Sequence, residues 1–124
     1  MFSMWVLLWI VLGLSNPIFA SKPKLMEMNN NFNLLEDISF VLHCYLLSGS
    51  KPVFFDWLKD GHRVFNSSKV KIGNFDSFST LSLNDLHRSD SGVYMCSVKN
   101  AFGNDSVSSI INVKGFYYFQ IEFI

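Results

Sequence analysis

One seven-residue stretch, Asp90-Ser91-Gly92-Val93-Tyr94-Met95-Cys96, decides how the rest of this sequence is interpreted. Tyr94 and Cys96 in this stretch, and Val98 just after it, alternate with residues of the opposite face, which is the period-two pattern of a β-strand. The sequence holds 2 cysteines, and the other one, Cys44, lies in a second alternating segment. Two cysteines are too few for a four-cysteine metal site, but they suffice for one disulfide.

Further alternating segments flank this stretch and are separated by turn residues. A strong turn signal is Lys59-Asp60-Gly61, which is typical of a tight hairpin, and a longer turn is expected over residues 100–105. Beyond residue 20, no long stretch keeps the 3.6-residue period of a helix. The sequence therefore predicts an all-β domain of about seven or eight strands, a pattern typical of a two-sheet sandwich. The side chains expected to face inward are Ile38, Phe40, Leu42, Cys44, Leu46, Val53, Phe55, Trp57, Val70, Ile72, Leu81, Leu83, Tyr94, Cys96, Val98, Val107, Ile111 and Val113.

The composition limits the classes of protein that this chain belongs to. It has 124 residues, and 10 Lys+Arg balance 10 Asp+Glu. Because a protein that grips nucleic acid through its phosphates normally carries a basic excess, we expect no nucleic-acid partner. Hydrophobic residues make up 49% and charged residues 16%, which argues against intrinsic disorder. The length allows one domain of ordinary size.

The first 20 residues resemble a secretory signal peptide. Met4 to Leu14 is an apolar run, Asn16-Pro17 breaks a helix, and Ala20 offers a small residue at a cleavage point. The run is too short to cross a bilayer comfortably, so no transmembrane segment is predicted in this chain. The segment before the run has no Lys or Arg, which leaves a signal anchor as the alternative. A cleaved signal predicts a secreted protein, or one on the extracellular side of the plasma membrane, where disulfides persist.

The order Cys44, Trp57, then Asp-x-Gly-x-Tyr-x-Cys ending at Cys96 resembles the immunoglobulin superfamily over Pro23 to Val113. The resemblance implies a two-sheet Greek-key sandwich in which a Cys44–Cys96 disulfide bridges the sheets and Trp57 packs on it. It also implies a tyrosine corner, in which the Tyr94 hydroxyl bonds backbone upstream. The core signature carried over in this way is Trp57, Leu83, Asp90, Gly92 and Tyr94.

The subtype is narrowed by residues around the second cysteine. Asn100 and Gly103 resemble the intermediate (I-set) group, and residues 57–61 and 78–83 resemble domains of the Down syndrome cell adhesion molecule family. We expect the domain to cover residues 21–114. Family members usually carry Gly at the turn where Asp37 stands, and Asp visits the left-handed region at modest cost.

Residues 115–124 form an apolar, aromatic tail that is too short to span a bilayer as a helix. One interpretation is a truncated or mis-spliced chain, whose last residues have no selected structure. The other is an extension of the last strand that pairs with the edge of another chain.

No constellation of residues predicts catalysis, a cofactor or a metal. Ser21-Lys22-Pro23-Lys24 and Ser48-Gly49-Ser50-Lys51 match a bare Ser-x-x-Lys string, but the companion motifs of that enzyme class are missing. His43, His62 and His87 are separate and lack the spacing of metal ligands. The sequence therefore predicts a non-catalytic binding module.

Surface positions supply the remaining candidates. Asn66-Ser67-Ser68 and Asn104-Asp105-Ser106 are acceptor sequences for N-linked glycans, at Asn66 and Asn104. If Trp57 and Cys44 face inward, alternation sends a second set of residues outward from two paired strands. We expect this set to form one partner surface, with its apolar members side by side: Phe54, Asp56, Leu58, Val93 and Met95.

Two functions follow from this sequence. The first is cell adhesion by an immunoglobulin domain of a neuronal or immune surface receptor, present as a fragment, whose partner is a copy of itself or another immunoglobulin-superfamily protein. The second is a freely secreted single-domain protein that binds a soluble ligand in humoral defence.

Overall fold

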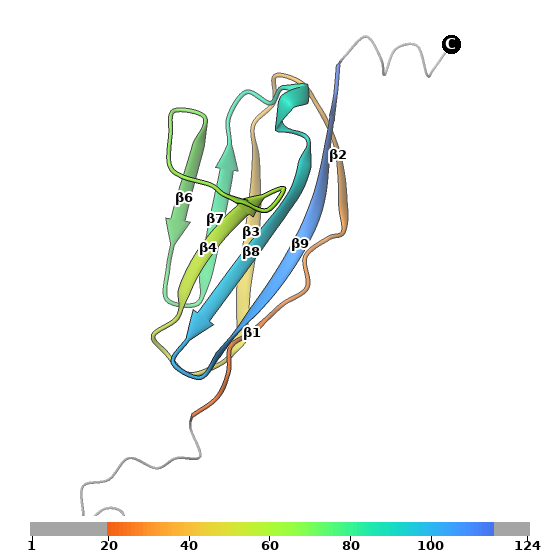
Figure 1. Cartoon of the computed structure of the whole chain (residues 1–124). Coiled ribbons are helices and arrows are strands. Elements are labelled where there is room, and N and C mark those ends of the chain that lie inside the picture. The colour runs from red at the N-terminus through yellow and green to blue at the C-terminus, as the bar shows by residue number, and fades with distance from the viewer. Residues whose placement is uncertain (1–19, 116–124) are drawn as a thin grey trace, which may run out of the picture.

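The structure is a computed structural model, and it describes residues 20–115. Within that range the chain forms nine strands and one short 3₁₀ turn (Figure 1). The strands are β1 (Lys24–Leu25), β2 (Asn31–Leu35), β3 (Phe40–Ser48), β4 (Phe54–Lys59), β5 (His62–Arg63), β6 (Val70–Asn74), β7 (Phe78–Leu83), β8 (Gly92–Asn100) and β9 (Gly103–Lys114), and the 3₁₀ turn η2 covers Arg88–Asp90.

The strands form two sheets that face each other. One sheet has the order β1-β3-β7-β6 and the other has the order β2-β9-β8-β4-β5. The N-terminal part of the chain belongs to both sheets, because β1 pairs antiparallel with β3 and β2 pairs parallel with β9. The predicted all-β sandwich is confirmed. The two short strands β1 and β2 were not predicted, and they raise the strand number above the expected seven or eight.

The core lies between the sheets and is centred on the predicted disulfide. Cys44 on β3 and Cys96 on β8 are bonded, with their Cα atoms 6.4 Å apart, so the Cys44–Cys96 bridge is confirmed. Trp57 on β4 is the cross-strand partner of Cys96 and is 1% exposed. The same buried cluster contains Leu42, Phe55, Leu81, Leu83, Leu86, Tyr94, Val98, Ile111 and Val113.

A buried hydrogen-bond chain links the two sheets beside the disulfide. The indole Nε1 of Trp57 donates to Oγ of Ser79 at 2.8 Å, and Ser79 in turn donates to Oδ1 of Asn74 at 2.6 Å. Ser79 is fully buried on β7. These hydrogen bonds give the indole N–H a partner inside an apolar core, as a buried tryptophan requires.

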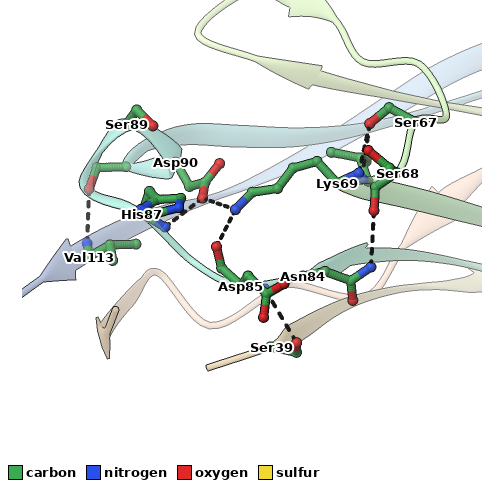
Figure 2. A network of polar contacts seen from close by, with 12 residues as sticks. Ser39, Ser67, Ser68, Lys69, Asn84, Asp85, His87, Ser89, Asp90 and Val113 are labelled. Atoms are coloured by element: carbon green, nitrogen blue, oxygen red, sulfur yellow. Dashed lines mark hydrogen bonds and ion pairs between the residues drawn. The ribbon is translucent and has the colours of Figure 1, made fainter. Parts of the chain in front are cut away.

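The connection between β7 and β8 is fixed by Tyr94 and by Asp90, and Figure 2 shows the side-chain contacts of Asp90. The Tyr94 hydroxyl donates to the backbone oxygen of Asp90 at 2.6 Å, which is the geometry of a tyrosine corner. The Asp90 carboxylate accepts from the backbone N–H of His87 at 2.8 Å and pairs with Nζ of Lys69 at 2.8 Å. Lys69 also donates to the backbone oxygen of Asp85, so this corner holds the start of β6.

Gly92 is required by a close approach of the hairpin between β4 and β5. A Cβ atom on Gly92 would lie 2.7 Å from Oδ2 of Asp60. The same Asp60 carboxylate accepts from the backbone N–H of Val93 at 2.9 Å. Any side chain at position 92 would therefore displace the Asp60 carboxylate and disturb its hydrogen bond to Val93.

Two sequence-based expectations are wrong in detail. Ile38 was expected to face inward but is 43% exposed, because the strand begins only at Phe40, after a turn in which Asp37 has φ 70°. The turn expected over residues 100–105 is shorter, since β9 already begins at Gly103. The Asn100 side chain tightens it by accepting from the backbone N–H groups of Phe102 and Gly103.

Two other expectations lie almost entirely outside the described residues: the signal peptide over residues 1–20 and the aromatic tail over residues 115–124. They stay predictions. Across residues 20–115, no helix has the length and apolar character needed to cross a membrane.

Candidate functional site

The outer face of the β2-β9-β8-β4-β5 sheet carries the residues that the sequence assigned to a partner surface. Phe54, Asp56 and Leu58 lie on β4, and Val93 and Met95 lie on β8. Side chains on this face alternate with the buried residues Phe55, Trp57, Tyr94 and Cys96, as the period of a strand requires.

The strand register shows which of these residues are neighbours. Leu58 lies opposite Met95 across β4 and β8, and Val93 lies opposite Ile110 across β8 and β9. Val93 and Met95 are successive outward residues of β8. These four residues, which we call the apolar cluster, are therefore contiguous. Val93 is 43% exposed and Ile110 is 46% exposed, whereas Leu58 and Met95 are half-buried.

Phe54 does not join the apolar cluster, which corrects the expectation that all the apolar members lie side by side. The cross-strand pair Asp56–Ser97 separates Phe54 from the pair Leu58–Met95. Asp56 also forms an ion pair with the neighbouring strand β5, because its Oδ1 lies 2.8 Å from the guanidinium of Arg63. The pair Asp56–Ser97 therefore divides the predicted patch into two parts with a polar row between them.

Phe54 belongs instead to the end of the domain where the chain enters. It lines a shallow hollow together with Lys51, Pro52, Lys99 and Phe102. Phe54 and Phe102 are exposed there, so both aromatic and basic side chains line this hollow.

A groove opens where β4 and β5 of one sheet pass β6 of the other. It is lined by residues that include Arg63, Phe65, Asn66 and Ile72. Phe65 is 68% exposed, and the Arg63 guanidinium lies 5.4 Å from the centre of its ring. Asn66 is exposed at the groove, and its Oδ1 accepts from the backbone N–H of Ile72 at 2.7 Å.

Asn104, the second glycan candidate, lies in a different environment. It is exposed on β9 and lies opposite Lys99 of β8, inside the ladder of the five-stranded sheet. Its neighbour Asp105 accepts from the backbone N–H of Leu25 at 2.8 Å and so ties β9 to the N-terminal segment. The two acceptor sequences therefore lie on different sides of the domain.

The electrostatics of the described residues do not point to a reactive group. Burial, followed by the negative charges of Asp90 and Asp60, raises the pKa of the Tyr94 hydroxyl above its ordinary value. This tyrosine already donates a structural hydrogen bond to Asp90. In residues 20–115 no group of His, Cys, Asp and Glu side chains is arranged to hold a metal ion.

Three of the exposed apolar residues that line the surfaces described above were not predicted from the sequence: Ile110, Phe65 and Phe102. The signal for Ile110 was present, because alternation that places Ile111 inward sends Ile110 outward. Phe65 and Phe102 lie in connections outside the strands, where alternation says nothing about direction.

Comparisons with known proteins agree with this architecture. Residues 23–113 match the family described as Immunoglobulin I-set domain. The chain is 36% identical over 92 residues to the muscle M-line assembly protein unc-89 of Caenorhabditis elegans, covering 73% of this chain and 1% of that protein. It is 34% identical over 101 residues to the membrane-bound isoform of pro-neuregulin-1 of Mus musculus, covering 79% of this chain and 16% of that protein. The chain thus spans only a small part of these relatives.

Among solved structures, an I-band fragment from titin superposes with a TM-score of 0.71 at 27% identity. The superposition covers 76% of this chain and 33% of the titin fragment. The family match spans most of the chain and includes the disulfide, the buried tryptophan and the tyrosine corner described above. This chain therefore belongs to the immunoglobulin I-set domain family.

Proposed function

We propose that this chain is a non-catalytic extracellular recognition module that binds another protein through the apolar cluster of its five-stranded sheet. The partner is a second copy of the chain or another immunoglobulin-superfamily surface protein. The observation that carries the proposal is the contiguity of Leu58, Met95, Val93 and Ile110 on one exposed sheet face. Scattered apolar residues are ordinary on a protein surface, whereas a contiguous group marks an interaction site more often.

The surroundings of the cluster resemble the rim of a protein interface. Asp56 and Arg63 form an ion pair on one side, and Ser108 lies opposite Met95 on β9. On the other side of the cluster, the Asn112 amide on β9 donates to Asn31 on β2, the opposite edge strand of the sheet. A small apolar centre inside a polar rim is the usual anatomy of a protein–protein interface.

Two features support an extracellular location. The Cys44–Cys96 disulfide lies in the centre of the core, and such bonds persist in oxidising compartments. The neuregulin relatives are named as membrane-bound isoforms. Cell adhesion on a neuronal or immune surface is the finer proposal, and it is supported by the resemblance of residues 57–61 and 78–83 to Down syndrome cell adhesion molecule domains.

The proposal is tested by a charge placed at the centre of the cluster. Val93→Asp and Ile110→Asp should each abolish self-association, or binding to the partner, in analytical ultracentrifugation and bead-aggregation assays. Val41→Asp is the matched control, because Val41 is 40% exposed on β3 of the opposite sheet. Folding of each variant is checked by circular dichroism.

The Phe54→Asp variant shows whether binding uses the apolar cluster or the hollow that Phe54 lines with Lys51 and Lys99. We expect it to leave binding intact, since a polar row divides Phe54 from the cluster. If folded Val93→Asp and Ile110→Asp proteins bind as strongly as the parent, or if Phe54→Asp alone abolishes binding, the assignment of the surface is wrong.

A second function is favoured by one observation, the identity to a muscle M-line assembly protein. In that case the domain would be a structural unit of a muscle assembly. Expression of the full chain in animal cells distinguishes the two, because only the extracellular module should reach the medium with its disulfide formed.

A further inference from the structure

The N-linked glycan acceptor sequence at Asn66 lies beside β6, at the edge of the four-stranded sheet. Resting on the extracellular function proposed above, we propose that Asn66 carries an N-linked glycan that covers the open edge of β6. In the strand order β1-β3-β7-β6, β6 is the last strand of its sheet.

The Asn66 side chain already occupies part of that edge. Its Oδ1 accepts from the backbone N–H of Ile72 at 2.7 Å, in the position where a neighbouring strand would offer a carbonyl oxygen. The backbone N–H of Ser67 donates at 2.8 Å to the backbone oxygen of Val70, which lies two residues before Ile72 on β6. A sugar bonded to Nδ2 leaves Oδ1 available, so glycosylation keeps the bond to Ile72.

The loop that presents Asn66 is held at both ends. Before it, the backbone N–H of Val64 donates to the backbone oxygen of Trp57 at 2.8 Å. After it, Ser67 Oγ accepts from the backbone N–H groups of Lys69 and Val70, both at 3.1 Å. Lys69 is anchored by Asp90, as Figure 2 shows. A glycan on Asn66 therefore leaves the domain from a fixed place.

An open strand edge is a hazard for a β protein, because it offers unpaired backbone groups to another chain. The exposed Lys71 on β6 is one common protection against such pairing. A bulky, hydrated glycan rooted beside Ile72 is a stronger one, since it occupies the space that an incoming strand needs. Asn104 lies elsewhere, opposite Lys99 and next to the turn between β8 and β9.

The modification joins Asn66 to an oligosaccharide carried on a lipid pyrophosphate, which is its co-reactant. The amide Nδ2 forms a bond to the anomeric carbon and loses one proton. The bond between that carbon and the pyrophosphate oxygen breaks, and the lipid pyrophosphate leaves with the electron pair. No atom is oxidised or reduced.

The first experiment measures occupancy. The full chain is expressed through the secretory pathway of animal cells with Asn104→Gln, so that only Asn66 can be modified. We expect a mass increase that an endoglycosidase specific for Asn-linked glycans removes. Ser68→Ala should abolish the increase because it destroys the acceptor sequence. Ser68→Thr is the matched control, since it changes the same residue but keeps the acceptor sequence.

The second experiment measures edge protection in a Val93→Asp background, which silences the apolar cluster. At high concentration, the unglycosylated Ser68→Ala protein should self-associate more than the glycosylated Ser68→Thr protein in light scattering. If the glycosylated and unglycosylated proteins self-associate equally, the glycan does not protect the β6 edge and this part of the proposal is wrong. A secreted chain without a glycan at Asn66 would overturn this inference alone, whereas a chain retained in the cytosol would overturn the extracellular function.

Discussion

Replacing Ser79 by Ala tests whether the core is organised around the hydrogen bond of Trp57. The Trp57 indole N–H is buried and donates to Ser79 Oγ at 2.8 Å. Ser79→Ala leaves this donor without its acceptor in a place that water does not reach, which costs about 1–3 kcal/mol. Asn74, the other partner of Ser79, is exposed and regains water. The loss should therefore come almost entirely from the indole.

A double-mutant cycle separates this hydrogen bond from packing. In a Trp57→Phe background there is no indole N–H to strand, so Ser79→Ala should cost clearly less than it does in the parent. The difference between the two costs is the coupling energy, expected at about 1 kcal/mol or more. Guanidinium denaturation followed by circular dichroism measures all four proteins. Ser82→Ala, on the outward side of the same strand β7, is the control and should stay within about 0.5 kcal/mol of the parent. Equal costs of Ser79→Ala in both backgrounds would refute the reasoning.

Two further predictions concern the bridge and the tyrosine corner. Removing the disulfide by Cys44→Ala with Cys96→Ala should cost about 4 kcal/mol by loop-closure entropy for a sequence separation of 52, and urea denaturation checks this. The pKa of Tyr94 is raised in the folded domain, so its hydroxyl stays protonated while that of the unfolded chain ionises. The stability that it contributes is complete below about pH 10 and declines as the pH rises above it. Tyr94→Phe should make this alkaline decline shallower and cost about 0.5–1.5 kcal/mol at neutral pH, and thermal unfolding from pH 7 to 11 measures both effects. An unchanged alkaline slope in Tyr94→Phe would contradict the tyrosine prediction, and free thiols in the oxidised parent would contradict the first.

The central strands were predictable because one face of each strand packs in the apolar core and the other face points away from it. Leu42, Cys44, Trp57 and Cys96 alternate with outward residues, and burial follows that alternation in the structure. The strand β2 was not predictable in the same way. It reads Asn31-Phe32-Asn33-Leu34-Leu35, and its partner β9 is distant in the sequence. A parallel pairing over that distance leaves no local turn signal.

The recognition surface was predictable in direction but not in arrangement. Alternation alone sends Phe54, Leu58, Val93 and Met95 outward. Which of them touch depends on the register of β4, β8 and β9, and no residue pattern within one strand contains that information. The register placed Ile110 beside Val93, and it placed Ser97 beside Asp56, which lies between Phe54 and Leu58 on β4.

The parallel pairing of β2 with β9 also has a mechanical consequence. The described chain enters at one end of the sandwich and leaves at the other, as Figure 1 shows. Tension between those ends pulls β2 and β9 along their lengths in opposite directions. The strands are matched over five residue pairs, from Asn31–Ile110 to Leu35–Lys114, so the hydrogen bonds between them share the load in shear. An antiparallel hairpin pulled from its open end would lose such bonds one at a time. A domain joined to neighbours through its two ends would therefore resist stretching until this whole row of bonds yields together.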